Sequence, residues 1–270
     1  RFNYNWNEND RQTYAFDDMG YGFMERPDNY QEYMDSTLSK YASYTTFRHD
    51  AQISFRINRE KFRLNTGIRL QPQQTRLEYT QKQHYSLTKN VFNWNPTFDF
   101  RYMFTEHTEM RFRANGSSSQ PSMTNLLPIT DNSNPLYITQ GNPNLKPSTY
   151  FRNRIYVRYA TPKVNISLWA AHSRNLNPIY NRYTYVTDLS SPYYNMFMSQ
   201  SCNAKHNDLI NFEAQFGYTG IKNLMINTIA GWDRFTFSGY GDLKPFENFY
   251  ANINIAYVLK NWRFSGRYEI

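Results

Sequence analysis

The sequence predicts an all-β chain that forms part of an antiparallel up-and-down transmembrane β-barrel. Three observations predict this fold: long segments alternate apolar and polar residues, short turns alternate with long connections, and 18% of the residues are aromatic. Alternation with a period of two is typical of strands that have one apolar face. We therefore expect ten strands in five hairpins, with residues 1–6 as the end of an eleventh strand.

The first hairpin shows the alternation most clearly. In residues 47–57, Ile53 and Phe55 fall on one face, while Ser54 and Arg56 fall on the other. Residues 58–61 are polar and form a turn, after which the alternation resumes. The hairpin therefore presents one apolar and one polar face.

The other hairpins repeat this unit. Strands are expected at 62–70, 92–104, 109–115, 151–159, 164–170, 210–218, 224–232, 249–259 and 262–270. The short turns are expected at 58–61, 105–108, 161–163, 220–223 and 260–261, and the long connections at 72–91, 117–148, 175–206 and 237–247. Strands of about 9–11 residues suit a bilayer, and short turns opposite long loops are typical of outer-membrane barrels.

Helical periodicity is weak in this sequence. Residues 29–42 have irregular three-to-four spacing of large residues, for which we expect a surface loop with at most one short helix. No apolar run reaches the roughly 18 residues that a membrane-spanning helix requires. A barrel strand can still cross a membrane, because its polar face lowers the mean hydropathy.

Composition excludes several function classes. The net charge is +8, but the arginines are dispersed along the strands, so no nucleic-acid partner is expected. The lone Cys202 excludes a disulfide framework within the chain. The histidines lack metal-ligand spacing, catalytic and cofactor motifs are missing, and Asp188 and Asp208 are expected to be loop acids. We therefore predict no enzymatic activity, no cofactor and no metal site.

A soluble β-sandwich or β-propeller is the alternative fold, because one-sided strands occur there too. A propeller would show a fixed repeat with four strands per unit, and a sandwich favours shorter strands. The unequal spacing of the turns and the long strands favour the membrane barrel.

The connection at 117–148 contains several short blocks in a fixed order. It includes Gln120-Pro121-Ser122-Met123-Thr124-Asn125-Leu126 and Asp131-Asn132-Ser133-Asn134-Pro135-Leu136, and it ends in Gly141, Asn142, Pro143, Asn144, Leu145, Lys146 and Pro147. Gly permits positive φ, while Pro fixes φ and removes an N–H donor. These residues therefore predict a rigid structural loop that leads into a strand.

This stretch resembles the barrel part of TonB-dependent receptors, in particular the outer-membrane β-barrel family common in Bacteroidetes. The resemblance implies a 22-stranded barrel closed by a plug, which imports a scarce solute (siderophore, glycan or peptide) with energy from TonB. It also implies a Gram-negative outer membrane, with lipid and lipopolysaccharide as partners.

The chain departs from that whole protein. Residues 1–270 are expected to be part of one barrel domain with no plug domain, so TonB would act through a plug outside this segment. Such a segment is not expected to transport by itself. The alternative function is a non-transporting binding module, either a surface adhesin barrel or a soluble β-domain.

Aromatic residues in the connection at 175–206 are the best candidates for contact with a solute. They are Tyr180, Tyr183, Tyr185, Tyr193, Tyr194 and Phe197. Aromatic faces suit sugars or siderophores, and Tyr adds a hydroxyl group. The competing interpretation, which we favour, is that these rings pack the loop or that 180–186 extends a strand.

Overall fold

A computed structural model describes residues 2–11, 28–34, 39–80, 83–134, 137–239 and 244–270. These residues form sixteen strands and two short 3₁₀ helices, η1 (Tyr30–Tyr33) and η2 (Thr124–Leu126). In this part of the chain, no helix is both long and apolar enough to cross a membrane. The prediction of an all-β antiparallel architecture is confirmed.

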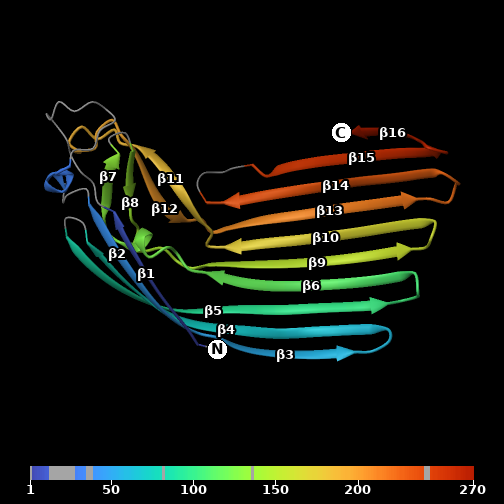
Figure 1. The fold of residues 1–270 in the computed structure, drawn as a ribbon, viewed down its shortest axis with the longest axis horizontal. Helices are drawn as coiled ribbons and strands as arrows, with labels where there is room; N and C mark the ends of the chain where they lie inside the picture. Colours follow the sequence, from blue (N-terminus) through green and yellow to red (C-terminus); the bar gives the residue numbers. More distant parts are fainter. Residues whose placement is uncertain (1, 12–27, 35–38, 81–82, 135–136, 240–243) are drawn as a thin grey trace.

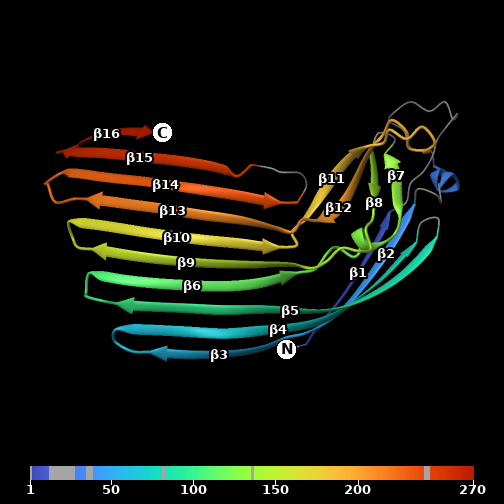
Figure 2. The same cartoon turned by 180° about the vertical axis from the view of Figure 1, so that it is seen from behind.

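Most strands belong to one curved antiparallel sheet (Figures 1 and 2). Its members are β1 (Phe2–Arg11), β2 (Lys40–His49), β3 (Ala51–Asn58), β4 (Phe62–Thr80), β5 (His84–Met103), β6 (Thr108–Ser119), β9 (Ser148–Ala160), β10 (Val164–Leu176), β13 (His206–Tyr218), β14 (Leu224–Ser238), β15 (Phe246–Leu259) and β16 (Trp262–Glu269). Among the described residues, the ladder runs from β1 at one edge to β16 at the other, so the sheet is open.

β3 continues β2 along the same partner strand. Arg48 pairs with Gln73, and Ala51 pairs with Leu70, so both strands follow β4 in one register. The ladder is interrupted at Asp50, whose carboxylate accepts hydrogen bonds from Arg69 Nε at 2.8 Å and Gln71 Nε2 at 3.2 Å. Counted as one strand, β2 and β3 bring the described long strands to the expected number of about ten to eleven.

The register places apolar side chains in rows across the outward face of the sheet. One row consists of Phe100, Phe112, Ile155, Ala170, Phe212, Trp232 and Phe249. Phe55, Leu168 and Ile255 are also exposed on this face, at 57%, 45% and 43%. Large apolar side chains are rarely left in water over so wide an area, so this face is built for hydrocarbon.

The hairpin turns agree with the prediction, but one long connection does not. β9–β10 and β15–β16 turn at 161–163 and 260–261, as expected. The segment 72–91, however, is no long loop: β4 and β5 stay paired from Phe62–Tyr102 to Thr80–His84. Beyond Gln71 the alternation continues, but its apolar face is reversed. Leu77 and Tyr79 of β4, with Tyr85 and Leu87 of β5, lie on the inner side, where they pack in or against a buried cluster.

The segment expected to be a loop with at most one short helix is also part strand. Of residues 29–42, Tyr30–Tyr33 form η1, whereas Lys40 already begins β2. β2 and the paired ends of β4 and β5 (residues 72–80 and 84–91) rise beyond the rest of the sheet, and we call them the outer extension (Figure 1).

A second sheet of four strands stands beside the outer extension, at the end of the main sheet opposite the short turns (Figure 2). It comprises β7 (Thr130–Asn134), β8 (Tyr137–Gln140), β11 (Ile179–Tyr185) and β12 (Phe197–Asn203). We call it the outer sheet. Two long connections build it, because β8 from one pairs in parallel with β12 from the other.

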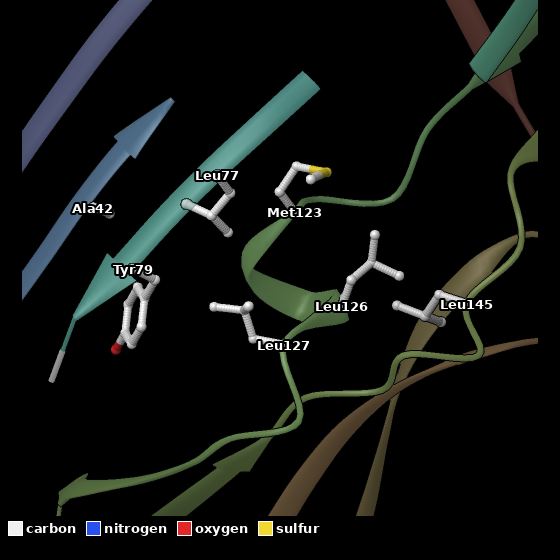
Figure 3. Packing of buried hydrophobic residues seen from close by; sticks show 7 residues of the cluster. All are labelled: Ala42, Leu77, Tyr79, Met123, Leu126, Leu127 and Leu145. Carbon is white, nitrogen blue, oxygen red and sulfur yellow. The ribbon is translucent and has the colours of Figure 1, made fainter. Parts of the chain in front are cut away.

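Apolar residues seal the contact between the outer extension and the connection after β6 (Figure 3). Leu77 and Tyr79 of β4 are 0% and 6% exposed, and they lie beside Leu126, Leu127 and Leu145. Leu77 and Tyr79 point to the same side of β4 as the inward-facing Arg63 and Arg69. This cluster therefore lies on the inner side of the sheet, above the apolar belt.

Candidate ligand-binding site

The structure separates the six candidate aromatic residues into distinct environments. Tyr180, Tyr183 and Tyr185 lie on β11 and Phe197 begins β12, while Tyr193 and Tyr194 lie in the connection between these strands. β11 pairs with β12 in the outer sheet and does not lengthen a strand of the barrel wall. Residues 179–185 are strand, as the alternative for 180–186 predicts, and this strand belongs to the outer sheet.

One face of the outer sheet carries a ladder of aromatic rings. Tyr183 lies 6.2 Å from Tyr137, and Tyr185 lies 5.1 Å from Phe197, between ring centroids. Tyr183 and Phe197 are 62% and 54% exposed despite these contacts. The rings thus support one another and still offer their faces to a ligand.

Tyr180 has a different role from its neighbours. Its ring meets Phe237 of β14 edge-on, with 5.5 Å between centroids. It therefore packs the outer sheet against the main sheet, as the packing interpretation predicts for such rings.

Tyr193 and Tyr194 belong to a tight turn. The Tyr194 N–H donates to the Ser191 carbonyl at 3.1 Å, and the Met196 N–H donates to the Tyr193 carbonyl at 3.2 Å. Asp188 accepts hydrogen bonds from the hydroxyl and backbone N–H of Ser190, and these lower the pKa of the Asp188 carboxyl. The turn is thus fixed by its own polar groups.

The Gly141–Pro147 block fastens the connection after β6 to β12. A Cβ on Gly141 would lie 1.7 Å from the Leu127 carbonyl oxygen, so close approach of two backbones requires glycine. The φ angle of Gly141 lies outside the left-handed region, so glycine is needed here for the close approach and not for its conformational freedom. Asn203 of β12 accepts a hydrogen bond from the Lys146 N–H at 2.7 Å and donates to the Lys146 carbonyl at 3.0 Å.

A cavity of about 340 Å³ opens between this connection and the outer extension. It is lined by Ala42, Tyr44, Tyr79, Thr124, Asn125, Ile129, Asp131, Thr139, Gln140 and Gly141. Its volume lies at the small end of the range of roughly 300–1,000 Å³ that small-molecule sites occupy. We call it the outer cavity.

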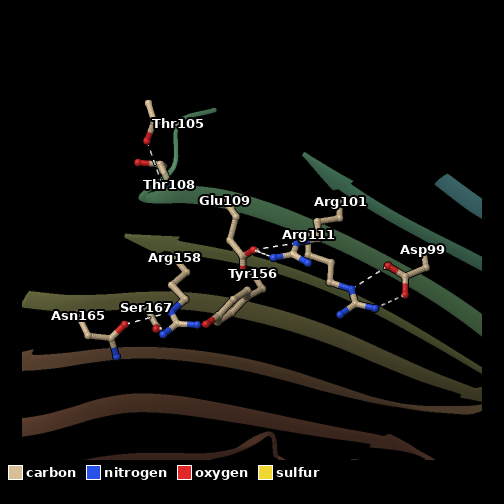
Figure 4. Close-up of polar contacts among 10 residues, drawn as sticks. All are labelled: Asp99, Arg101, Thr105, Thr108, Glu109, Arg111, Tyr156, Arg158, Asn165 and Ser167. Carbon is tan, nitrogen blue, oxygen red and sulfur yellow. Dashed lines mark hydrogen bonds and ion pairs between the residues drawn. The ribbon is translucent and has the colours of Figure 1, made fainter. Parts of the chain in front are cut away.

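The inner face of the main sheet is rich in arginine (Figure 4). Asp99 receives Arg111 Nε at 2.8 Å and Arg113 Nε at 3.2 Å, while Glu109 receives Arg101 Nε at 2.8 Å. Two hollows of about 810 and 450 Å³ lie along this wall. Arginines outnumber carboxylates in both linings, so the inner wall is polar and positively charged.

A charged cluster on the outward face marks the upper limit of the apolar belt. Asp208 lies in β13 and not in a loop, which corrects the sequence-based expectation. Three basic groups lie close to the Asp208 carboxylate. The distances to it are 3.0 Å from His172 Nε2, 3.4 Å from His206 Nε2 and 3.6 Å from Arg174 Nε. Such groups belong at the level of lipid headgroups, above the hydrocarbon.

In the part of the chain that the structure describes, no group of three or more His, Cys, Asp or Glu side chains is arranged to hold a metal ion.

Sequence reasoning missed the outer cavity and the residues that line it. Tyr44 and Tyr79 lie outside the strands predicted from sequence, and Asp131, Thr139 and Gln140 come together only through the β7–β8 pairing. The only sequence feature that pointed to this region was the order of blocks in residues 120–147. It indicates a rigid loop but does not indicate which strands the loop contacts.

The main sheet has an apolar outward face and a charged inner face, with short turns at one end and large connections at the other. Together these features define an outer-membrane β-barrel protein. The chain belongs to the Outer membrane protein beta-barrel family, which residues 1–269 match. Its place is therefore the outer membrane of Gram-negative bacteria. No curated protein sequence matches the chain.

Three solved structures are similar in fold. The copper transporter OprC is 11% identical, with a TM-score of 0.60, over 86% of this chain and 35% of that chain. The FrpB iron transporter from Neisseria meningitidis (F3-3 variant) is 14% identical, with a TM-score of 0.55, over 85% and 33%. The siderophore receptor PirA from Pseudomonas aeruginosa is 12% identical, with a TM-score of 0.50, over 86% and 50%.

This chain spans half or less of the length of those proteins. At such low identity, the similarity establishes the fold alone. By their titles, the three are transporters or receptors and not enzymes.

Proposed function

We propose that residues 1–270 form part of the barrel domain of a TonB-dependent importer, which takes up a scarce solute across the outer membrane. The observation that carries this proposal is the wall itself, with an apolar outward face and an arginine-rich inner face. A polar lumen wall suits a passage for a solute, or a folded plug that closes it. Siderophores, glycans and peptides are the solute classes considered.

The proposal includes the partners that such an importer needs. TonB would act through a plug that lies outside these residues, and the outward face would contact lipid and lipopolysaccharide. The order of blocks in residues 120–147 supports a Bacteroidetes-type receptor. The structurally similar proteins are transporters or receptors by their titles, which supports a transporter and not an enzyme.

A surface adhesin is the second candidate, because the ladder of Tyr137, Tyr183, Tyr185 and Phe197 is exposed beyond the belt. An adhesin would bind its ligand without needing energy from TonB. The soluble β-domain, by contrast, is excluded by the family and by the exposed apolar belt.

Uptake in a TonB-deficient strain tests the proposal. The natural full-length protein is expressed in parent and deletion strains, and accumulation of labelled candidate solutes is compared with surface binding at low temperature. We expect binding in both strains and accumulation only in the parent. Equal accumulation in both strains, or binding without accumulation in either, would contradict import through TonB.

A further inference from the structure

Three arginines of β6 and β9 lie together on the inner wall, at the depth of the apolar belt. Arg113 of β6 is the direct register partner of Arg154 of β9, and Arg152 lies two residues before Arg154 on the same face. Ile155, next in the chain, belongs to the apolar row on the outward face. We call Arg113, Arg152 and Arg154 the arginine triad. Like charges directly opposite each other destabilise a sheet, so the triad requires an anionic partner.

The carboxylate on the β5 side does not supply this partner. Asp99 accepts hydrogen bonds from Arg111 Nε at 2.8 Å and from Arg113 Nε at 3.2 Å, and β6 separates it from β9. Among the described residues, no carboxylate oxygen lies within ion-pair distance of Arg152 or Arg154. The Nε atoms of these two arginines are buried there without a hydrogen-bond acceptor.

The carboxylate on the other side, Glu213 of β13, is already occupied by neutral donors. Trp169 Nε1 donates to it at 2.7 Å, Gln215 Nε2 at 2.6 Å and the Tyr250 hydroxyl at 2.8 Å. These contacts saturate Glu213 without using a cation. The same network fixes the indole of Trp169 in place.

The fixed indole orients Arg154. The guanidinium carbon of Arg154 lies 5.2 Å from the centroid of the Trp169 ring. A cation–π contact uses the face of the planar guanidinium and leaves its N–H edge available. An edge with two parallel donors matches the two oxygens of a carboxylate or a phosphate.

A hollow of about 450 Å³ borders this edge, and both Arg113 and Arg154 line it, together with Tyr156 and Trp169. Its volume lies within the range of roughly 300–1,000 Å³ that small-molecule sites occupy. We propose that the arginine triad binds an oxyanion, a carboxylate or phosphate group that enters this hollow from the lumen.

Two sources offer this chemistry. One is a free anionic solute in the lumen, and the other is an acidic side chain of the full-length protein that projects into the lumen from outside residues 1–270. The inference goes beyond the proposed function, because an adhesin barrel with this wall would carry the same site. Its failure would leave uptake through TonB unaffected.

Calorimetric titration tests the first source. The natural full-length protein is purified in detergent micelles and titrated at low salt with citrate and, separately, with inorganic phosphate. Arg158→Gln is the matched control for Arg154→Gln, because Arg158 lies on the same face of β9 but donates to Asn165 Oδ1 at 3.1 Å and does not line the hollow. We expect saturable binding of at least one probe, weakened at least about tenfold in Arg154→Gln and unchanged in Arg158→Gln.

Thermal unfolding of the same three proteins tests the second source. A side chain that occupies the triad would prevent both probes from binding. Arg154→Gln should then unfold at a lower temperature than the natural protein at neutral pH. This difference should disappear in acid, where the partner carboxylate is protonated, and Arg158→Gln should show no such pH dependence.

The absence of probe binding together with no pH-dependent loss of stability in Arg154→Gln would overturn the inference. Probe binding that Arg154→Gln leaves unchanged would overturn it as well. Equal effects of Arg154→Gln and Arg158→Gln would show a general attraction of anions to the basic wall, and would likewise refute a site at the triad.

Discussion

Gly141 occupies a position where a side chain has no room. Its missing Cβ allows the Leu127 carbonyl oxygen to come close, and its own N–H donates to the Ile129 carbonyl at 2.9 Å. The connection after β6 therefore folds back on itself at this residue. The outer cavity, which Gly141 also lines, depends on that fold.

Replacing Gly141 by alanine should loosen this connection. The new methyl group would overlap backbone and not a flexible side chain, so we expect a loss of about 3 kcal/mol in local stability. Hydrogen exchange of residues 123–147 measures the effect. Gly266→Ala is the matched control, because its Cβ would meet nothing within 4 Å. Equal protection in both variants would contradict the close approach.

Glu78 gives the outer extension a dependence on pH. Hydrogen bonds from Arg76, at 2.7 Å, and from Ser86, at 3.0 Å, lower the pKa of the Glu78 carboxyl. A pKa that is lowered by folding contributes stability above the unfolded value of 4.5, and this stability is lost as pH falls through the folded value.

Glu78→Gln should therefore be less stable than the natural protein at neutral pH, with a difference that vanishes in acid. Thermal unfolding of both proteins between about pH 3 and pH 7 measures this. A constant difference across that range would show that the carboxylate charge does not contribute.

At the scale of elements, the outer sheet exists because two connections meet. The side-chain amide of Asn203 in β12 makes hydrogen bonds with the backbone N–H and carbonyl of Lys146. It also donates to the Asn177 carbonyl at 2.8 Å. One side chain thus ties together three segments that are far apart in sequence. Its amide plays the part that a strand partner would play in a regular ladder.

Asn203→Ala should release the Lys146 backbone from β12. Unpaired backbone groups cost about 1–3 kcal/mol each when they stay buried, so the loop should open to water instead. Hydrogen exchange of the Lys146 amide, which donates to Asn203, should become faster, and the Thr219 amide, which donates to the Lys163 carbonyl, serves as the internal control. Unchanged exchange at Lys146 relative to Thr219 would show that this anchor is dispensable.

The hairpins could be predicted from sequence and the outer sheet could not, for a physical reason. In 151–159 and 164–170, one face must be apolar because it meets lipid, so the alternation reveals the strands. In the hairpin formed by the ends of β4 and β5, the apolar side chains change to the inner face, where Leu77 and Tyr79 are buried, so this segment does not continue the pattern of the lipid-facing strands although the pairing persists. The β8–β12 pair joins residues about sixty positions apart, and no local signal announces it.

The candidate site, too, could be predicted from sequence only in part. The Gly141–Pro147 block was recognisable because its turn residues are unusual, whereas its need for glycine arises from Leu127, fourteen positions earlier. Tyr183 and Tyr180 look alike in sequence, yet one is exposed in the ladder and the other packs on Phe237. Only the pairing of β11 with β12 distinguishes them.

At the scale of the whole molecule, two opposite surfaces explain the architecture. The outward face carries a belt of aromatic and aliphatic side chains, and its polar limit is marked by Asp208 with His172 and Arg174. The inward face carries arginines and their carboxylate partners. A strand that separates lipid from a wet lumen requires this division at every residue.

The most direct test of this account measures that division along one strand. Nitroxide labels are placed singly at residues 210–217 of β13, in full-length protein with Cys202→Ser, reconstituted in lipid vesicles. Collisions with oxygen, which concentrates in lipid, and with a water-soluble nickel complex are then compared for each label. The account predicts oxygen access at Phe212, Ala214 and Phe216, and lower oxygen access at Asn211, Glu213 and Gln215. Equal access at neighbouring positions, or the reverse alternation, would contradict it.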